Sequence, residues 1–188
     1  MNIYDPYPDH VTVDGKSYRI NTNYDAFLRA VDVYDMPDLT NEDKLDLQCR
    51  LLLAGKKVPK DPQTQSAIVR AVFDLLPKRG EKTNEKYMDL HQDALLIRSA
   101  FKRIGIDLSR DYVHFLQFFE LLADLPSDTA LMRIIDIRRR PIPSLTKYNG
   151  DQVRALQEAK AKVALKLTDE ERMARFANGL RNSSILRG

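Results

Sequence analysis

The chain is short of several residue types, and each shortage excludes a class of structure. Its 188 residues include one cysteine, no tryptophan and seven glycines. Because Cys49 is alone, no intrachain disulfide and no cysteine-based zinc site can form, which favours a reducing compartment. Cys49 lies within an apolar helical pattern, so we expect a small buried residue there and not a nucleophile.

Long apolar runs are also missing. No stretch approaches the roughly 18 consecutive apolar residues that a membrane-spanning helix needs. The first ten residues, MNIYDPYPDH, lack the basic-then-apolar order of a secretion signal. We therefore expect a protein that works in the cytoplasm without a membrane.

Signatures of catalysis and of cofactor binding are absent from the sequence. The three histidines, His10, His91 and His114, are far apart and have no ligand-like spacing, so we expect no metal site. There is no glycine-rich phosphate loop, no GxSxG turn and no distinctive carboxylate pair. We expect no enzyme, no catalytic residue and no cofactor.

The composition that remains, 43% hydrophobic and 30% charged, is typical of a helical globular protein. Residues 11–20 predict a β-hairpin, because Asp14 and Gly15 suit the two positive-φ positions of a type I′ turn between alternating flanks. A two-stranded hairpin is marginally stable alone, so we expect it to pack on helices.

Helical signals follow the hairpin. Thr40 with Asp43 predicts a capped helix start, Pro62 suits a first helical turn, and Gly105 suits a helix end. Residues 138–144 are predicted to be extended, because residues before proline avoid the α region. The predicted helices cover about residues 24–36, 40–55, 61–76, 90–104, 110–123, 128–137 and 151 onward.

These elements predict a mainly α fold: a multi-helix domain with a short N-terminal β-hairpin and a long C-terminal amphipathic helix. We predict two domains, residues 1–145 and residues 146–188, the second a basic amphipathic helix and tail. A polar stretch, PKRGEKTNEKY, predicts a flexible loop at about residues 77–88 of the first domain. The last helix has a thin apolar stripe, so it must dock on something to be stable.

Residues 104–125, IGIDLSRDYVHFLQFFELLADL, are the most apolar stretch. Ser109 is predicted to cap a helix over about 110–123 that is apolar on most of its circumference. Such a helix must be surrounded, either by its own domain or by a partner, and the sequence leaves both open. Its candidate protein-binding residues are Tyr112, His114, Phe115, Phe118 and Phe119.

Charge is divided unevenly along the chain. Residues 1–50 carry 5 basic and 10 acidic side chains, and residues 129–188 carry 13 basic and 6 acidic ones. This polarity suits head-to-tail contact between copies or an acidic partner, although exposed helices can produce it without either role. Arg138, Arg139 and Arg140 are candidate contacts to an acidic protein surface. Without interleaved aromatics they are a weak nucleic-acid signal, so nucleic acid is a less favoured partner than protein.

The sequence resembles a family of small proteins of long-tailed siphophages that infect Gram-positive bacteria, encoded just before the tape-measure gene. The resemblance lies in VTVDGKSYRINTNYDAFLR, in the spacer LTNEDKL and in the block IGIDLSRDYVHFLQFFELLADLPSDTALMRIIDIRRRPI. It covers about residues 3–145, and the fixed order of these segments is more telling than any one of them. The tryptophan pair of the family's aromatic helix is replaced here.

The resemblance implies a tail assembly chaperone, a non-enzymatic protein of the host cell cytoplasm that binds and solubilises the tape-measure protein during tail morphogenesis. It places Tyr112, His114, Phe115, Phe118 and Phe119 at the family's aromatic helix, with Arg138 or Arg139 near its final arginine. The implied partners are the tape-measure protein, further copies of this chain and a second tail chaperone protein. Two alternatives stay open: a structural tail or connector component of the virion, and a nucleic-acid-binding regulator acting through Arg138–Arg140.

Overall fold

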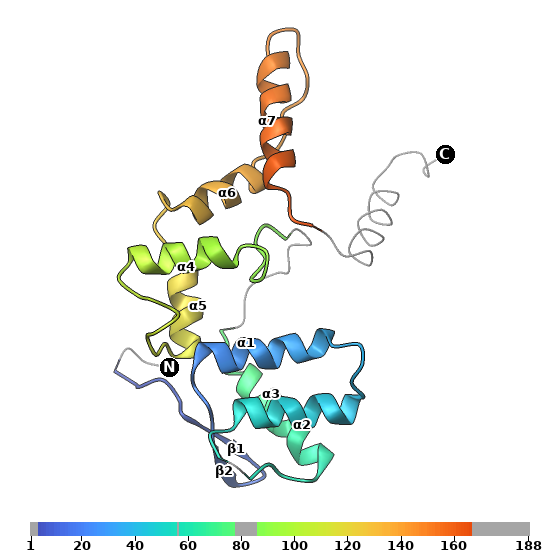
Figure 1. The fold of residues 1–188 in the computed structure, drawn as a ribbon, viewed down its shortest axis with the longest axis vertical. Coiled ribbons are helices and arrows are strands. Elements are labelled where there is room, and N and C mark those ends of the chain that lie inside the picture. The colour runs from blue at the N-terminus through green and yellow to red at the C-terminus, as the bar shows by residue number, and fades with distance from the viewer. Residues whose placement is uncertain (1–3, 56, 78–85, 167–188) are drawn as a thin grey trace. The chain divides into compact units, whose positions relative to one another are not determined.

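The computed structural model describes residues 4–55, 57–77 and 86–166 (Figure 1). Within them the predicted mainly α fold with an N-terminal hairpin is confirmed. The elements are β1 (His10–Val13), β2 (Lys16–Arg19), α1 (Tyr24–Asp32), the 3₁₀ helix η1 (Val33–Asp35), α2 (Asn41–Leu52), α3 (Pro62–Phe73), α4 (Ala94–Arg103), α5 (Phe115–Ala123), α6 (Ala130–Arg139) and α7 (Gly150–Val163). At 14 residues α7 is the longest helix of the described residues.

The chain divides into two compact units. Unit 1 comprises residues 1–83 and 101–125, and unit 2 comprises residues 84–100 and 126–188. These units alone do not decide whether residues 1–145 and 146–188 are separate domains, so that division stays a prediction. Most of the loop predicted at 77–88 lies outside the described residues.

The hairpin of unit 1 has the predicted turn. Asp14 and Gly15 have φ values of 49° and 73°, and β1 pairs antiparallel with β2 in the register that a two-residue turn imposes. Val11 and Val13 alternate with exposed residues and are buried, and β1 packs against α3. The hairpin therefore depends on the helices, as its small size requires.

Helices α1, α2 and α3 surround the core of unit 1. Thr40 and Asp43 form the predicted capping box of α2, and Asp61 accepts a hydrogen bond from the Thr64 amide at the start of α3. Cys49 is fully buried, as expected, and burial raises the pKa of its thiol to about 11. The core residues of these elements are Val11, Val13, Ile20, Phe27, Ala30, Cys49, Leu52, Leu53, Ile68, Val69 and Val72, with Phe115 and Leu116 of α5.

The helix predicted over residues 110–123 starts later than expected, because residues 113–115 pair with another part of the chain. The Tyr24 amide donates to the Val113 carbonyl at 2.9 Å, and the Phe115 amide donates to the Thr22 carbonyl at 2.8 Å. The predicted cap at Ser109 is therefore wrong: α5 begins at Phe115 and His114 is its N-cap. Ser109 instead donates to Asp107 in the turn that follows α4.

Unit 2 is built from residues 94–100 of α4 together with α6 and α7, which pack against each other. Its buried apolar side chains are Ile97, Ala100, Leu131 and Val153. The extended stretch predicted at 138–144 begins later than expected, because α6 continues through Arg139. Arg140, which precedes Pro141, leaves the helix with φ −57° and ψ 124°. In the part of the chain that the structure describes, every helix is too short or too polar to cross a bilayer.

Candidate protein-binding site

The phenylalanines of the candidate site lie mainly in the interior of unit 1. Phe115 is fully buried and its ring stacks on Phe27 with 4.7 Å between centroids. Phe118 is 2% exposed and its ring lies between those of Tyr24 and Phe101, at 4.9 and 5.1 Å. Phe119 is half-buried and meets Phe27 edge-on. Their burial follows from the all-round apolar character of α5, and it leaves little of these rings for a partner.

His114 joins the N-terminal arm to the start of α5. Its Nδ1 accepts a hydrogen bond from the Leu116 amide at 3.1 Å, and its Nε2 lies 3.2 Å from the Pro8 carbonyl oxygen. Because Nδ1 is an acceptor, Nε2 carries the proton and donates to Pro8. The imidazole is stacked between Tyr7 and Phe115, and burial lowers the pKa of His114. His114, which the sequence proposed as a binding residue, thus connects the N-terminal arm to α5 within the fold.

Tyr7 completes this arrangement. Its hydroxyl donates to the Glu120 carboxylate on α5 at 2.5 Å, and this hydrogen bond raises the pKa of Tyr7. The polar groups around His114 therefore bond to one another and to the backbone. Such mutual pairing is typical of a polar network that fixes a chain segment.

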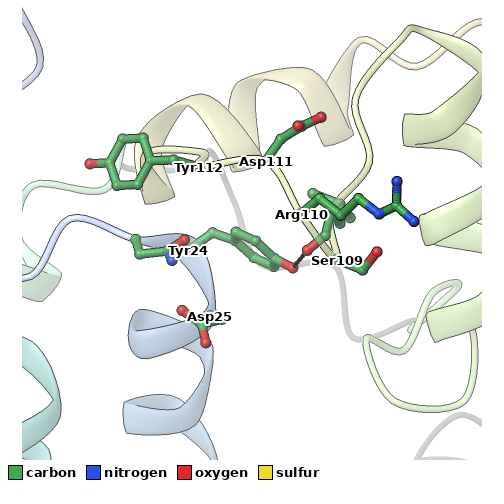
Figure 2. A pocket seen from close by; sticks show the side chains of 8 residues that line it. Tyr24, Asp25, Ser109, Arg110, Asp111 and Tyr112 are labelled. Atoms are coloured by element: carbon green, nitrogen blue, oxygen red, sulfur yellow. Dashed lines mark hydrogen bonds between the residues drawn. The ribbon is translucent and has the colours of Figure 1, made fainter.

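Tyr112 differs from the other candidate residues, because 65% of its surface is exposed. Its hydroxyl is hydrogen-bonded to the Thr22 hydroxyl. Beside it lies a cavity of about 240 Å³ that is lined by Asn23, Tyr24 and Asp25 at the start of α1 and by residues 108–112. Figure 2 shows Tyr24 reaching across toward the 108–111 loop, where its hydroxyl donates to the Leu108 carbonyl, while Tyr112 and Arg110 point to opposite sides.

The walls of this cavity carry hydrogen-bond acceptors. The Oδ1 atom of Asn23 is buried and has no hydrogen-bond partner among the described residues. Asn23 also stands at the N-cap of α1 without a side-chain capping bond. Asp25 and Asp111 line the same cavity. There Asp25 lies 3.7 Å from Arg29, and Asp111 accepts from the Asp107 amide. The site therefore combines the exposed Tyr112 ring with a small cavity. The Asn23 oxygen in that cavity can accept a hydrogen bond from a partner.

The three candidate arginines have different surroundings. Arg138 is only 11% exposed at its side chain and forms a bidentate pair with buried Asp93, at 2.7 and 2.9 Å. It also donates to the carbonyls of Tyr87 and Val163, so one guanidinium connects α6 with residues 87–93 and with the end of α7. Arg139 and Arg140 are exposed, and Arg140 pairs with Asp136 one turn earlier. Arg138 therefore has a structural role that the sequence did not reveal.

A model of the Bacteriophage Gp15 protein family matches residues 3–165. The chain belongs to this family. No curated protein matches it, and no solved structure matches it. The family places the chain among bacteriophage proteins and so supports a phage-related function. The match runs through α7, beyond the end of the resemblance at about residue 145.

Two features of this Gp15 family chain were missed from the sequence. Asp93 resembles any carboxylate near a helix start, and its partner Arg138 is 45 residues away. The second feature is the exposure of Ile142 and Leu145 after α6. The prolines predicted that this stretch is extended, but not that its apolar side chains are uncovered. No group of three histidine, cysteine or acidic side chains in residues 4–55, 57–77 and 86–166 could hold a metal ion.

Proposed function

We propose that the protein is a non-enzymatic tail assembly chaperone that binds the tape-measure protein in the host cell cytoplasm during tail morphogenesis. The observation that carries this proposal is membership in a bacteriophage family over residues 3–165. It is supported by the ordered segments of the sequence that resemble chaperones encoded before the tape-measure gene. The mainly helical fold suits a protein that packs against other polypeptides.

The surface around Tyr112 is the best candidate contact in unit 1. A cavity of about 240 Å³ is smaller than the roughly 300–1,000 Å³ of typical small-molecule pockets. It has room for one side chain of a protein partner, with the Tyr112 ring beside it to cover apolar surface. A tape-measure protein is a long helical polypeptide with apolar stripes, and helix-in-groove contacts bury such stripes.

Release of the chaperone is a further requirement, because tube protein must replace it during assembly. A single shallow contact of this kind is weak, so the retention of the chaperone should come from many copies acting together on one long partner. Modest affinity at each site is therefore consistent with the proposed role.

The test is co-expression with the product of the neighbouring tape-measure gene, with soluble yield and co-purification as readouts. We expect the wild-type chain to raise the soluble yield and to co-purify. Tyr112→Ala should weaken the complex about fivefold or more, since interface aromatics commonly contribute about 1 kcal/mol or more. Tyr4→Ala is the matched control, because Tyr4 is also a strongly exposed tyrosine of unit 1, at 89%.

Two results would contradict the proposal. Equal solubility of the tape-measure product with and without this protein, and no co-purification, would remove the chaperone role. Stoichiometric amounts of this chain in purified virions, measured by mass spectrometry, would favour a structural tail or connector component.

A further inference from the structure

In unit 2, residues 139–148 form a continuous exposed segment, which we call the basic strap. All ten residues are exposed, and Ile142, Leu145 and Tyr148 are 47%, 74% and 91% exposed. The strap has three basic side chains, Arg139, Arg140 and Lys147, and no acidic one. Large apolar side chains at this exposure, among charges of a single sign, are typical of a surface that binds another polypeptide.

The strap is held in shape at both ends. At its start the Lys160 ammonium of α7 donates to the Arg138 and Arg140 carbonyls at 2.7 and 2.6 Å. At its end the Asn149 side chain donates to the Ser144 carbonyl at 2.9 Å and accepts from the Thr146 amide at 2.7 Å. A segment whose conformation is already fixed by hydrogen bonds loses less conformational entropy when it binds. These contacts therefore favour a role of the strap as an interface.

Unit 1 carries a surface of the opposite charge at residues 33–43, which we call the acidic face. It holds four carboxylates, those of Asp35, Asp38, Glu42 and Asp43, and no basic residue. All four of these residues are exposed. Tyr34 and Met36 lie among them and are 54% and 40% exposed.

The acidic face is also held in shape. The capping box of Thr40 and Asp43 fixes the start of α2, and the Lys44 ammonium donates to the Tyr34 carbonyl at 2.9 Å. Both surfaces thus present an aromatic ring, an aliphatic side chain and an excess of one charge on a shaped backbone, with the Lys44 ammonium at the edge of the acidic face.

We propose that the basic strap of one copy docks on the acidic face of a second copy. The second copy is the occupant because the complementary surface, in charge and in apolar character, lies on the same chain. Opposite charges steer the encounter, and Tyr34, Met36, Leu145 and Tyr148 supply apolar area to bury. The two surfaces are different, so the contact is heterologous and leaves one unused surface at each end of a growing row of copies. This self-association does not depend on the tape-measure role.

The size of the strap indicates a reversible contact. Its ten residues are fewer than the roughly 20–30 residues on each side of a standard-sized interface. Assembly should therefore grow with protein concentration. It should also weaken with added salt, because the Debye length falls from about 10 Å at 0.1 M to about 3 Å at 1 M.

The experiment is sedimentation velocity on the full chain, over a range of protein and salt concentrations. We expect the average mass of the wild type to rise at least about twofold with concentration at low salt, as heterologous rows lengthen. The acid-to-base variant Asp35→Lys/Asp38→Lys and the base-to-acid variant Arg139→Glu/Lys147→Glu should each stay monomeric. Mixing the two variants should restore assembly, because the reversed surfaces again complement each other.

The matched control is Asp124→Lys/Glu158→Lys, which changes the net charge as much as the acid-to-base variant but at exposed residues outside both surfaces. It should assemble like the wild type. A wild type that is monomeric at every concentration, or assembly that survives both charge reversals, would overturn the proposal. Binding of the strap to the tape-measure product by a chain that is otherwise monomeric would assign the strap to that partner instead.

Discussion

At the scale of single residues, His114 uses both ring nitrogens to connect the N-terminal arm with α5. Nδ1 accepts from the Leu116 amide and Nε2 donates to the Pro8 carbonyl, and only the neutral ring can do both. Protonation of Nδ1 would place an N–H against the N–H of Leu116. The α5 cap therefore depends on the neutral form of His114, whose pKa burial lowers from its ordinary value.

This arrangement predicts a pH dependence of stability. Burial lowers the pKa of His114 below its ordinary value of 6.5, although the Pro8 carbonyl, Glu120 and Asp9 act in the opposite direction. The unfolded chain thus takes up the proton at a higher pH than the folded chain does. The stability present above pH 6.5 is lost as the pH falls through 6.5 toward the lower folded pKa. Urea midpoints should decrease over this window.

The variant His114→Asn isolates the effect, because asparagine keeps a side-chain acceptor at the N-cap and does not titrate. Its urea midpoint should depend less on pH below 6.5 than that of the wild type. Gln117→Asn, which changes a non-titrating residue of the same helix, is the control and should keep the wild-type dependence. If the urea midpoint of His114→Asn depended on pH as that of the wild type does, the pH dependence would not come from His114.

At the scale of elements, the sequence predicted what local chemistry decides. The turn at Asp14 and Gly15, the capping box at Thr40 and the end of α4 at Gly105 each depend on a few adjacent residues, and all three are confirmed. The start of α5 was missed, because it depends on pairing between residues 22–24 and 113–115, about 90 positions apart in sequence. Helical periodicity carries no information about such a partner.

Gly105 permits a quantitative test at this scale. Its φ of 86° lies in the left-handed region, and the Ile106 amide donates back to the Phe101 carbonyl, as in a Schellman motif. Gly105→Ala should lower the free energy of unfolding by about 1–2 kcal/mol, the penalty of a left-handed L-residue. Gly150→Ala is the control, because Gly150 begins α7 and does not have a positive φ. Urea unfolding should show no loss of stability in this variant. Equal effects of the two variants would contradict this account.

At the scale of the whole molecule, each unit has a different set of interior contacts. Unit 1 has stacked aromatic rings around Phe27, whereas unit 2 has the buried ion pair of Arg138 with Asp93. The all-round apolar pattern of α5 was compatible with either a core or an interface. Burial of Phe115 and Phe118 depends on rings from α1 and α4, which only the fold brings together. For the same reason the sequence could propose Arg138 as a residue that contacts a partner, but it could not show that the Arg138 guanidinium is already paired with Asp93.

The ion pair predicts a loss of stability confined to unit 2. Arg138→Ala leaves the Asp93 carboxylate buried without its cation, which typically costs about 3–5 kcal/mol. Amide hydrogen exchange followed by mass spectrometry should accelerate in α6 and α7, while α2 and α3 of unit 1 keep their protection. Arg133→Ala, at an exposed residue of α6, should change stability by no more than about 0.5 kcal/mol. Hydrogen exchange that accelerates equally in both units would contradict a stabilising role confined to unit 2.

The burial of Cys49 has a practical consequence. The one thiol of the chain is enclosed and holds its proton, so it should be nearly inert toward maleimides at neutral pH. A cysteine introduced on the surface, for example by Ser144→Cys in the basic strap, would then be the one reactive thiol. A spin label or fluorophore attached there would test the proposed contact between copies without removing the native cysteine.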